Sequence, residues 1–170
     1  REGYIGRSGR FHPEASPRIV EVDGVRRYIL ADEREAAGRA VYITESDIEN
    51  IITAKAAIFA AMKILIRRLE IDFGDIERFY IAGAFGRYLD VENAISIGLI
   101  PEIPRERIQF VGNTSIQGAK IVAFYREALR KIERIRVNTT YYDLMGAEDY
   151  IEEFRKAMFL PHTDIEEFHG

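Results

Sequence analysis

The chain has 170 residues, of which 47% are hydrophobic and 31% charged, and its 24 basic and 28 acidic side chains give a formal net charge of −4. A chain of this size buries about two thirds of its unfolded surface on folding, so we expect one globular domain. The basic residues form no stripe that could follow a phosphate backbone, and the composition therefore argues against a nucleic-acid partner.

The absence of cysteine narrows the possible chemistry. These residues cannot form disulfides, hold an iron–sulfur cluster or supply a thiolate nucleophile. The apolar runs are shorter than the ~20 residues of a membrane span, and no signal peptide pattern opens the chain. We therefore expect a cytoplasmic protein without a membrane partner. Because the chain begins with Arg1 and not with Met, we treat it as a fragment of a longer polypeptide.

The first predicted elements are three short strands. Two β-rich runs within residues 18–30 flank Asp23-Gly24, a dipeptide that favours the positive φ angles of a tight hairpin, and residues 41–44 form a third β-prone run. The glycine- and arginine-rich residues 1–17 are predicted to be a loop or disordered lead.

A long amphipathic helix is predicted next. Thr44 and Asp47 have the spacing of a capping box, although Asp replaces the usual Glu or Gln, and apolar residues then recur at three- and four-residue steps from Ile48 to Leu69. This pattern is typical of a helix that packs one face on a sheet.

The second half alternates short strands with helices. We predict strands at residues 78–83 and 108–111, a short helix over 91–97 capped by Asp90, and a longer helix from about Ser115 into the basic segment 130–136. The last expected elements are a β-prone run over 139–145 and a helix over 147–158, which ends before Pro161.

This order predicts an α/β fold. Parallel strands joined by helices cross over in a right-handed sense, so the last two strands should lie side by side with helices covering the sheet. We expect the ribonuclease H-like half-unit of the actin-like ATPase fold, with a mixed sheet, an N-terminal hairpin and helices on its faces. Residues 18–160 would form a single α/β nucleotide-binding subdomain, and residues 161–170 a solvated C-terminal tail without a metal site.

Two glycine-containing turns follow the predicted parallel strands. The first is AGAFG, with Gly83 and Gly86, and the second is GNTSIQGA, with Gly112, Asn113 and Gly118. Each glycine in an element interior costs about 1 kcal/mol relative to alanine, so either a flat ligand rests on the bare backbone or the chain packs tightly there. Because ligands bind at the carboxyl ends of parallel strands, two such turns at one edge favour a ligand site.

The ordered motifs ITESDIENIITAKAAI, FYIAGAFGRYLD, ISIGLIP, FVGNTSIQGA and FLPHTD cover most of the chain. Together they resemble the C-terminal ATPase domain of the reductive activators of corrinoid proteins, a ferredoxin-linked family within the superfamily of acetate kinase, sugar kinases, heat-shock chaperones and actin. The resemblance implies that Gly83, Ala84, Phe85 and Gly86 form the adenosine motif, and it implicates Gly112, Asn113 and Gly118 in a later connecting motif.

The resemblance also implies a function that the chain would perform only in part. Such activators use ATP with Mg to return Co(II) corrinoid proteins to Co(I) in methyl transfer, and their iron–sulfur cluster would lie in a region absent here. Nothing in the sequence matches the acidic DxGT-like phosphate loop of the superfamily, so the fragment alone is expected to be inactive. The implied partners are a corrinoid protein and the remainder of its own chain, with a possible homodimer.

Two functional alternatives stay open at this point. One is an ATP-dependent activator of a radical dehydratase, and the other is a nonenzymatic dimerisation or docking module whose glycines only pack. Lys55 leaves a similar choice, because it falls on or beside the apolar stripe of the long helix. Its ammonium either reaches water or meets an anion, and we include it among the candidate nucleotide-binding residues.

Overall fold

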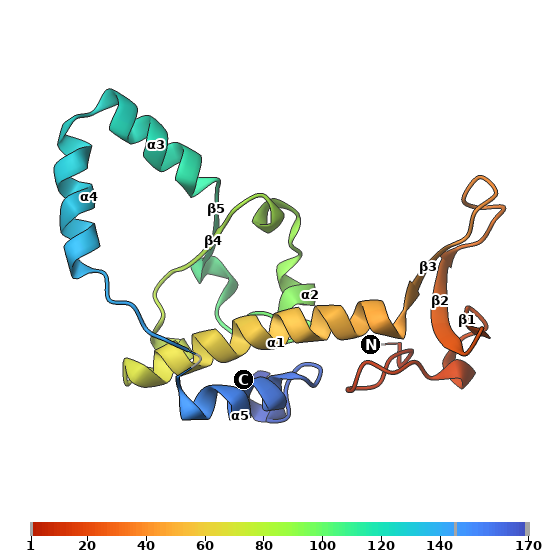
Figure 1. Cartoon of the computed structure of the whole chain (residues 1–170). Coiled ribbons are helices and arrows are strands. Elements are labelled where there is room, and N and C mark those ends of the chain that lie inside the picture. Colours follow the sequence, from red (N-terminus) through yellow and green to blue (C-terminus); the bar gives the residue numbers. More distant parts are fainter. Residues whose placement is uncertain (1, 145, 169–170) are drawn as a thin grey trace.

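A computed structural model describes residues 2–144 and 146–168, with the side chains of residues 85, 87 and 167 outside the description. The longest element is helix α1 (Glu45–Arg68), whose 24 residues run along the molecule for about 36 Å (Figure 1). The predicted capping box is confirmed. The Asp47 N–H donates to Thr44 Oγ1 at 3.1 Å, and the Thr44 N–H donates to Asp47 Oδ2 at 2.8 Å.

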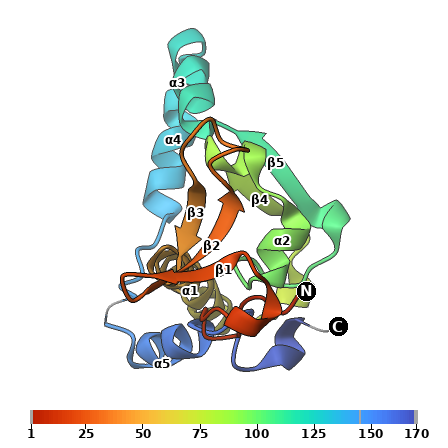
Figure 2. The ribbon, with the colours of Figure 1, turned by 90° about the vertical axis from the view of Figure 1, so that its right-hand side faces the viewer.

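A three-stranded antiparallel sheet stands at the N-terminal end of α1 (Figures 1 and 2). It contains β1 (Ile19–Val22), β2 (Val25–Ala31) and β3 (Val41–Thr44), in the order β1-β2-β3. The predicted hairpin is confirmed, because Asp23 and Gly24 form its two-residue loop with φ angles of 53° and 74°. Positive φ at both positions matches the twist of the flanking strands.

The other two strands, β4 (Phe79–Ala82) and β5 (Ile108–Gly112), pair in parallel as predicted. Between them lies α2 (Val91–Ser96), where the Asp90 carboxylate caps the helix by accepting the Asn93 N–H at 2.8 Å. The chain is therefore of the expected α/β class.

We expected one mixed sheet, but this is wrong: the described strands form two separate sheets. Among the described residues β3 pairs with β2 at the N-terminal end of α1, whereas β4 follows the other end of this 24-residue helix and pairs with β5.

The region after β5 departs most from the prediction. The single expected helix is divided into α3 (Thr114–Phe124) and α4 (Glu127–Asn138), because Tyr125 adopts an extended conformation with φ −126° and ψ 100°. Together α3 and α4 form an arm that stands away from the body (Figure 1). No glycine or proline marks this break in the sequence.

Residues 139–144 are not a strand, which corrects the predicted β-prone run, and its last position, 145, lies outside the described residues. The segment crosses from the arm to α5 (Glu148–Ala157) and pairs with no named strand. The helix predicted over 147–158 is confirmed.

Two hydrophobic clusters hold the body together on one face of α1. The larger one joins α1 to α2, α5 and the C-terminal segment through buried residues that include Phe59, Ile95 and Phe168. The smaller one joins α1 to β1 and the N-terminal segment through Ile48, Ile52, Ile19 and Phe11.

Both terminal segments are anchored to the body by a few buried side chains, although most of their other residues are exposed. Phe11 is 3% exposed in the N-terminal lead, and His162 is 0% exposed in the C-terminal tail. The two segments also contact each other, because the Leu160 N–H donates to the carbonyl oxygen of Arg7 at 2.9 Å. The expectation of a solvated tail does not hold for His162 and Phe168, which are buried against partners that lie far away in the sequence. No described helix combines the length and the hydropathy of a membrane span.

Candidate functional site

The two glycine turns meet at the carboxyl edge of the β4–β5 pair. The Gly83 N–H donates to the carbonyl oxygen of Gly112 at 2.8 Å, so the ends of the two strands are joined directly. Gly83 has a φ of 97° and Gly112 a φ of 66°, a region that side chains disfavour. The structure thus brings together the first residues of both predicted motifs.

The surroundings of Gly83 and Gly86 differ. A Cβ atom on Gly83 would meet no heavy atom within 4 Å, so a substituent there would project into open space. A Cβ atom on Gly86 would lie 2.7 Å from Ile81 Cγ2 and 3.6 Å from the Phe110 ring. Gly86 is therefore required by packing against the strands, whereas Gly83 leaves bare backbone exposed.

Ala84 precedes a 3-10 turn at Phe85–Tyr88 and is exposed. The side chain of Phe85 lies outside the described residues, so its predicted contact with a nucleotide stays a prediction.

The second motif runs from β5 into α3. Asn113 caps the helix, because its Oδ1 atom accepts the Ile116 N–H at 3.0 Å, and this leaves the side-chain N–H₂ group as its donor. The side-chain amide of Gln117 donates to the Val111 carbonyl oxygen at 3.1 Å, which joins α3 to the end of β5. Gly118 lies in the second turn of α3, exposed and with space around it. The edge therefore carries a helix N-terminus beside two glycines, an arrangement that suits an anionic ligand.

Lys55 does not belong to this edge, which corrects its assignment as a nucleotide-binding candidate. Its side chain is 1% exposed, and its ammonium donates to the carbonyl oxygens of Phe159 at 2.5 Å and Pro161 at 2.6 Å. Burial lowers the Lys55 pKa from 10.5 to about 8. The ammonium neither reaches water nor meets an anion, but anchors the C-terminal segment.

A buried polar cluster beside Lys55 was not anticipated from the sequence. Glu153 on α5 accepts from Arg67 at 2.6 Å, and its other oxygen lies 3.1 Å from His162 Nε2. His162 Nδ1 accepts the Asp164 N–H at 3.1 Å, so the other ring nitrogen, Nε2, is the one that faces Glu153. Burial raises the Glu153 pKa, but the hydrogen bond from His162 and the charge of Arg67 outweigh it and hold that pKa below its usual value.

This cluster is structural, because Arg67 and Glu153 join α1 to α5, and Glu153 and His162 join α5 to the C-terminal segment. The available signal in the sequence was one lysine inside an apolar helix and one histidine beside a late proline. Neither pattern predicts which residue the buried side chain contacts, since Lys55 and Pro161, for example, are 106 residues apart.

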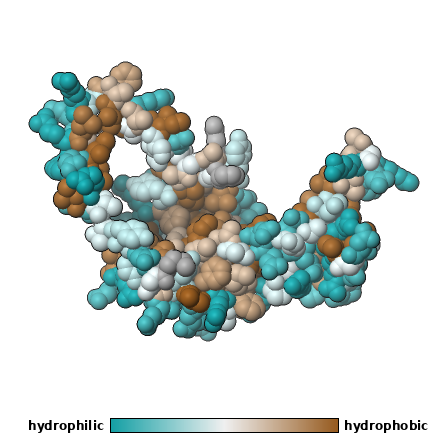
Figure 3. Space-filling model, viewed as in Figure 1, coloured by the Kyte–Doolittle hydropathy of each residue, from teal (hydrophilic) through white to brown (hydrophobic). Residues whose placement is uncertain are grey.

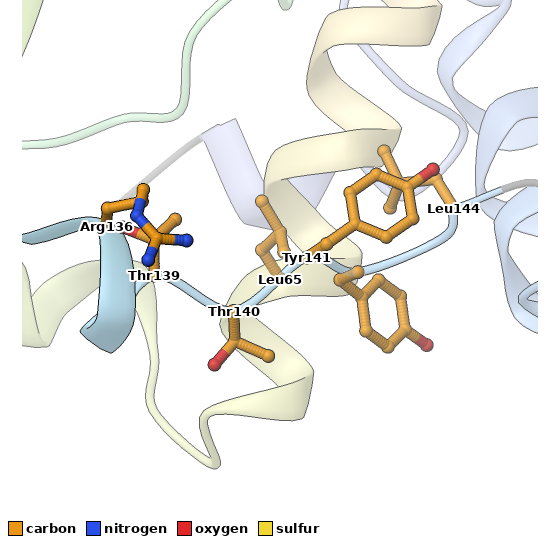
Figure 4. A pocket seen from close by; sticks show the side chains of 7 residues that line it. Leu65, Arg136, Thr139, Thr140, Tyr141 and Leu144 are labelled. Carbon is orange, nitrogen blue, oxygen red and sulfur yellow. The ribbon is translucent and has the colours of Figure 1, made fainter.

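A hollow with a mostly apolar lining lies away from the glycine turns, at the base of the arm (Figure 4). Leu65 of α1 forms its floor, and the crossing segment supplies Thr139, Thr140, Tyr141 and Leu144. It has no charged group except Arg136 and does not resemble a phosphate site.

A pair of parallel strands whose carboxyl ends carry two glycine turns and a helix N-terminus is an arrangement typical of α/β domains that bind nucleotides. The comparisons give the particular family. Residues 1–170 match the family described as the C-terminal domain of RACo, the ASKHA domain, and the chain belongs to this family. The actin-like fold expected from the motifs is thereby confirmed.

Two curated proteins are similar to this chain in sequence. The corrinoid activation enzyme RamQ of Eubacterium limosum is 31% identical over 163 residues, which cover 91% of this chain and 28% of that protein. The [Co(II) methylated amine-specific corrinoid protein] reductase of Methanosarcina barkeri is 36% identical over 110 residues, 65% of this chain and 20% of the relative.

A solved structure, a reductive activator for corrinoid, iron–sulfur protein, matches with a TM-score of 0.89 and 37% identity. The match covers 98% of this chain and 27% of that one. The chain thus spans about a quarter of the length of the relatives it matches.

Proposed function

We propose that this chain is the C-terminal nucleotide-binding part of an ATP-dependent reductive activator that returns a Co(II) corrinoid protein to Co(I). The names of both curated relatives and of the solved structure refer to corrinoid activation or reduction. They favour this function over the activation of a radical dehydratase and over a purely structural module.

One observation is the main support for nucleotide binding at this edge of the strand pair. The Gly83–Gly112 hydrogen bond places two left-handed glycines and the N-terminus of α3 at one edge. A flat base could rest on the bare backbone at Gly83 and Ala84, while Asn113 offers a donor and the α3 N-terminus favours negative charge. Gly86 would support this surface from below through its contact with Ile81.

ATP with Mg would supply the energy of binding and hydrolysis when bound, and the conformational change that follows would drive an uphill one-electron transfer. The electron would come from an iron–sulfur cluster outside these residues, since the chain contains no cysteine. The residues described here would bind and orient the nucleotide. A cytoplasmic location and a corrinoid protein as partner belong to the same proposal.

Nucleotide titration tests the site. In the polypeptide that carries this chain, Gly83→Val should weaken ATP binding at least tenfold, because the added side chain would fill the space above the backbone. Gly38→Val is the matched control, since Gly38 also has a positive φ, 90°, and open space around it but lies in the loop between β2 and β3. Equal ATP affinity in Gly83→Val and the wild type, with circular dichroism unchanged, would contradict the proposed site.

A further inference from the structure

Helix α1 is apolar on nearly all sides in its central part. Between residues 51 and 66 the only charged side chains are Lys55 and Lys63. One face packs into the two clusters, while the opposite face carries the α1 stripe, which we define as Ile51, Ala54, Ile58, Ala61 and Leu65. Ile51, Ile58 and Leu65 are 56%, 49% and 44% exposed. A helix that is apolar all round is typical of a protein interior, and a seven-residue repeat is typical of contact with another helix.

The α3–α4 arm, residues 114–138, also lacks cover among the described residues. No described side chain of α3 is buried, and Ala128 is the one buried residue of α4. Helices of 11 and 12 residues are marginal in water on their own. Large apolar side chains are exposed along the arm, at Ile116, Ile121, Phe124, Tyr125, Leu129, Ile132, Ile135 and Val137.

The α1 stripe and the arm meet at the hollow at the base of the arm, which is lined by Leu65 of the stripe and Arg136 of the arm. Figure 3 shows the arm standing away from the body, with apolar surface along it and beside the hollow. At the base of the arm, Leu65 of the stripe lines the pocket in Figure 4 together with Tyr141 and Leu144 of the crossing segment. An occupant of the hollow would therefore contact the C-terminal end of the stripe and the C-terminal end of the arm at once.

The β4–β5 pair also exposes apolar side chains that lack cover among the described residues. A parallel sheet is normally covered on both faces, and a sheet of two strands is only marginally stable. Tyr80 of β4 is 52% exposed and Phe110 of β5 is 46% exposed. Three elements of the chain thus expose surface that is typical of a domain core.

We propose that a segment of the same polypeptide, outside residues 1–170, fills this hollow and packs an apolar helix on the α1 stripe. The relatives support this occupant, because about three quarters of their length lies outside the region they share with this chain. A second copy fits less well. A twofold contact needs one self-complementary patch, whereas the uncovered surface is divided between α1, the arm and the strand pair around a hollow. This proposal does not depend on nucleotide binding.

Photo-cross-linking in the complete polypeptide tests the occupant. Benzoylphenylalanine would replace Ile58 in the stripe or, as the matched control, Thr53, which is exposed on the same helix but lies off the stripe. A mixture of ¹⁴N- and ¹⁵N-labelled protein distinguishes cross-links within one chain from those between two copies. We expect position 58 to cross-link within one chain to a residue outside 1–170, at a yield at least fivefold above that of position 53.

Hydrogen exchange of the same protein gives a second readout. Amides of α3 and α4 should exchange at least tenfold more slowly than those of an unstructured peptide of the same sequence, because the covered arm cannot open freely. Three results would each overturn the proposal. They are cross-links between copies, equal yields at positions 58 and 53, and an arm that exchanges at the unstructured rate, which would leave the hollow free for a separate partner.

Discussion

The ammonium of Lys55 lies 2.6 Å from the carbonyl oxygen of Pro161, although the two residues are 106 positions apart. The same ammonium also holds the carbonyl oxygen of Phe159. Arg7 of the N-terminal lead also holds this segment, through hydrogen bonds to the carbonyl oxygens of His162 and Leu160. The C-terminal segment is therefore fixed by cations from both the N-terminal lead and α1.

Replacing Lys55 by methionine should destabilise the fold by about 1–3 kcal/mol, because the carbonyl oxygens of Phe159 and Pro161 would lose their donor in a buried place. Urea unfolding measures the change, and protease cleavage near residue 160 should become faster. Lys120→Met is the control, since Lys120 is exposed on α3. Equal stability of Lys55→Met and the wild type would mean that the two carbonyls find other donors.

The depressed pKa of Lys55 predicts a dependence of stability on pH. Burial lowers this pKa to about 8 from 10.5, so between pH 8 and 10.5 the unfolded chain binds more protons at this site than the folded one. The contribution of Lys55 to the free energy of unfolding should therefore rise with pH across that window. The slope in Lys55→Met, measured by urea unfolding at several pH values, should be smaller than in the wild type. Parallel curves for the two proteins would contradict the shifted pKa.

The sequence predicted the features that depend on neighbouring residues. The Asp23-Gly24 hairpin, the Thr44–Asp47 capping box and the Asp90 cap are all formed by residues at most three positions apart. The parallel pairing of β4 with β5 followed from the helix between them.

What the sequence could not predict depends on distant partners. The placement of Lys55 required knowledge of Pro161, and the burial of His162 required Glu153 and Phe59. The separation of the sheets and the turn at Tyr125 follow from no local signal. In the candidate site, the sequence located both glycine turns but could not separate Gly83, which faces open space, from Gly86, which packs on Ile81.

Gly98 should not tolerate alanine. Its φ is 75°, and a Cβ atom would lie 2.1 Å from the carbonyl oxygen of Pro161. Backbone strain costs about 1–3 kcal/mol, and overpacking adds about 1–3 kcal/mol. Gly24→Ala is a matched control, because Gly24 has a φ of 74° with no atom within 4 Å, so it reports strain alone. Thermal unfolding should show the larger loss for Gly98→Ala, and equal losses would rule out the contact with Pro161.

Glu153→Gln should weaken the protein by about 1.5–3 kcal/mol, the range for hydrogen bonds to charged groups. The substitution keeps the shape but removes the charge that Arg67 and His162 face. Since the Glu153 pKa is lowered on folding, its stabilising effect is present above the unfolded pKa and is lost as pH falls through the folded value. Acid unfolding followed by circular dichroism should therefore be less steep in Glu153→Gln. If both proteins lose stability equally on acidification, another carboxylate controls the transition.

The role of Gly86 can be separated from that of Gly83 by a double-mutant cycle with Ile81. Gly86→Ala should cost about 1–3 kcal/mol of stability, because the new Cβ would lie 2.7 Å from Ile81 Cγ2. Ile81→Ala removes that methyl group and creates a cavity of its own. The double variant should then be less destabilised than the sum of the single variants, since residues in contact are coupled by about 0.5–3 kcal/mol. Urea unfolding of all four proteins gives the coupling energy. Strict additivity would show that Gly86 does not pack on Ile81. A direct contact with the nucleotide would then be the remaining reason for a glycine at position 86.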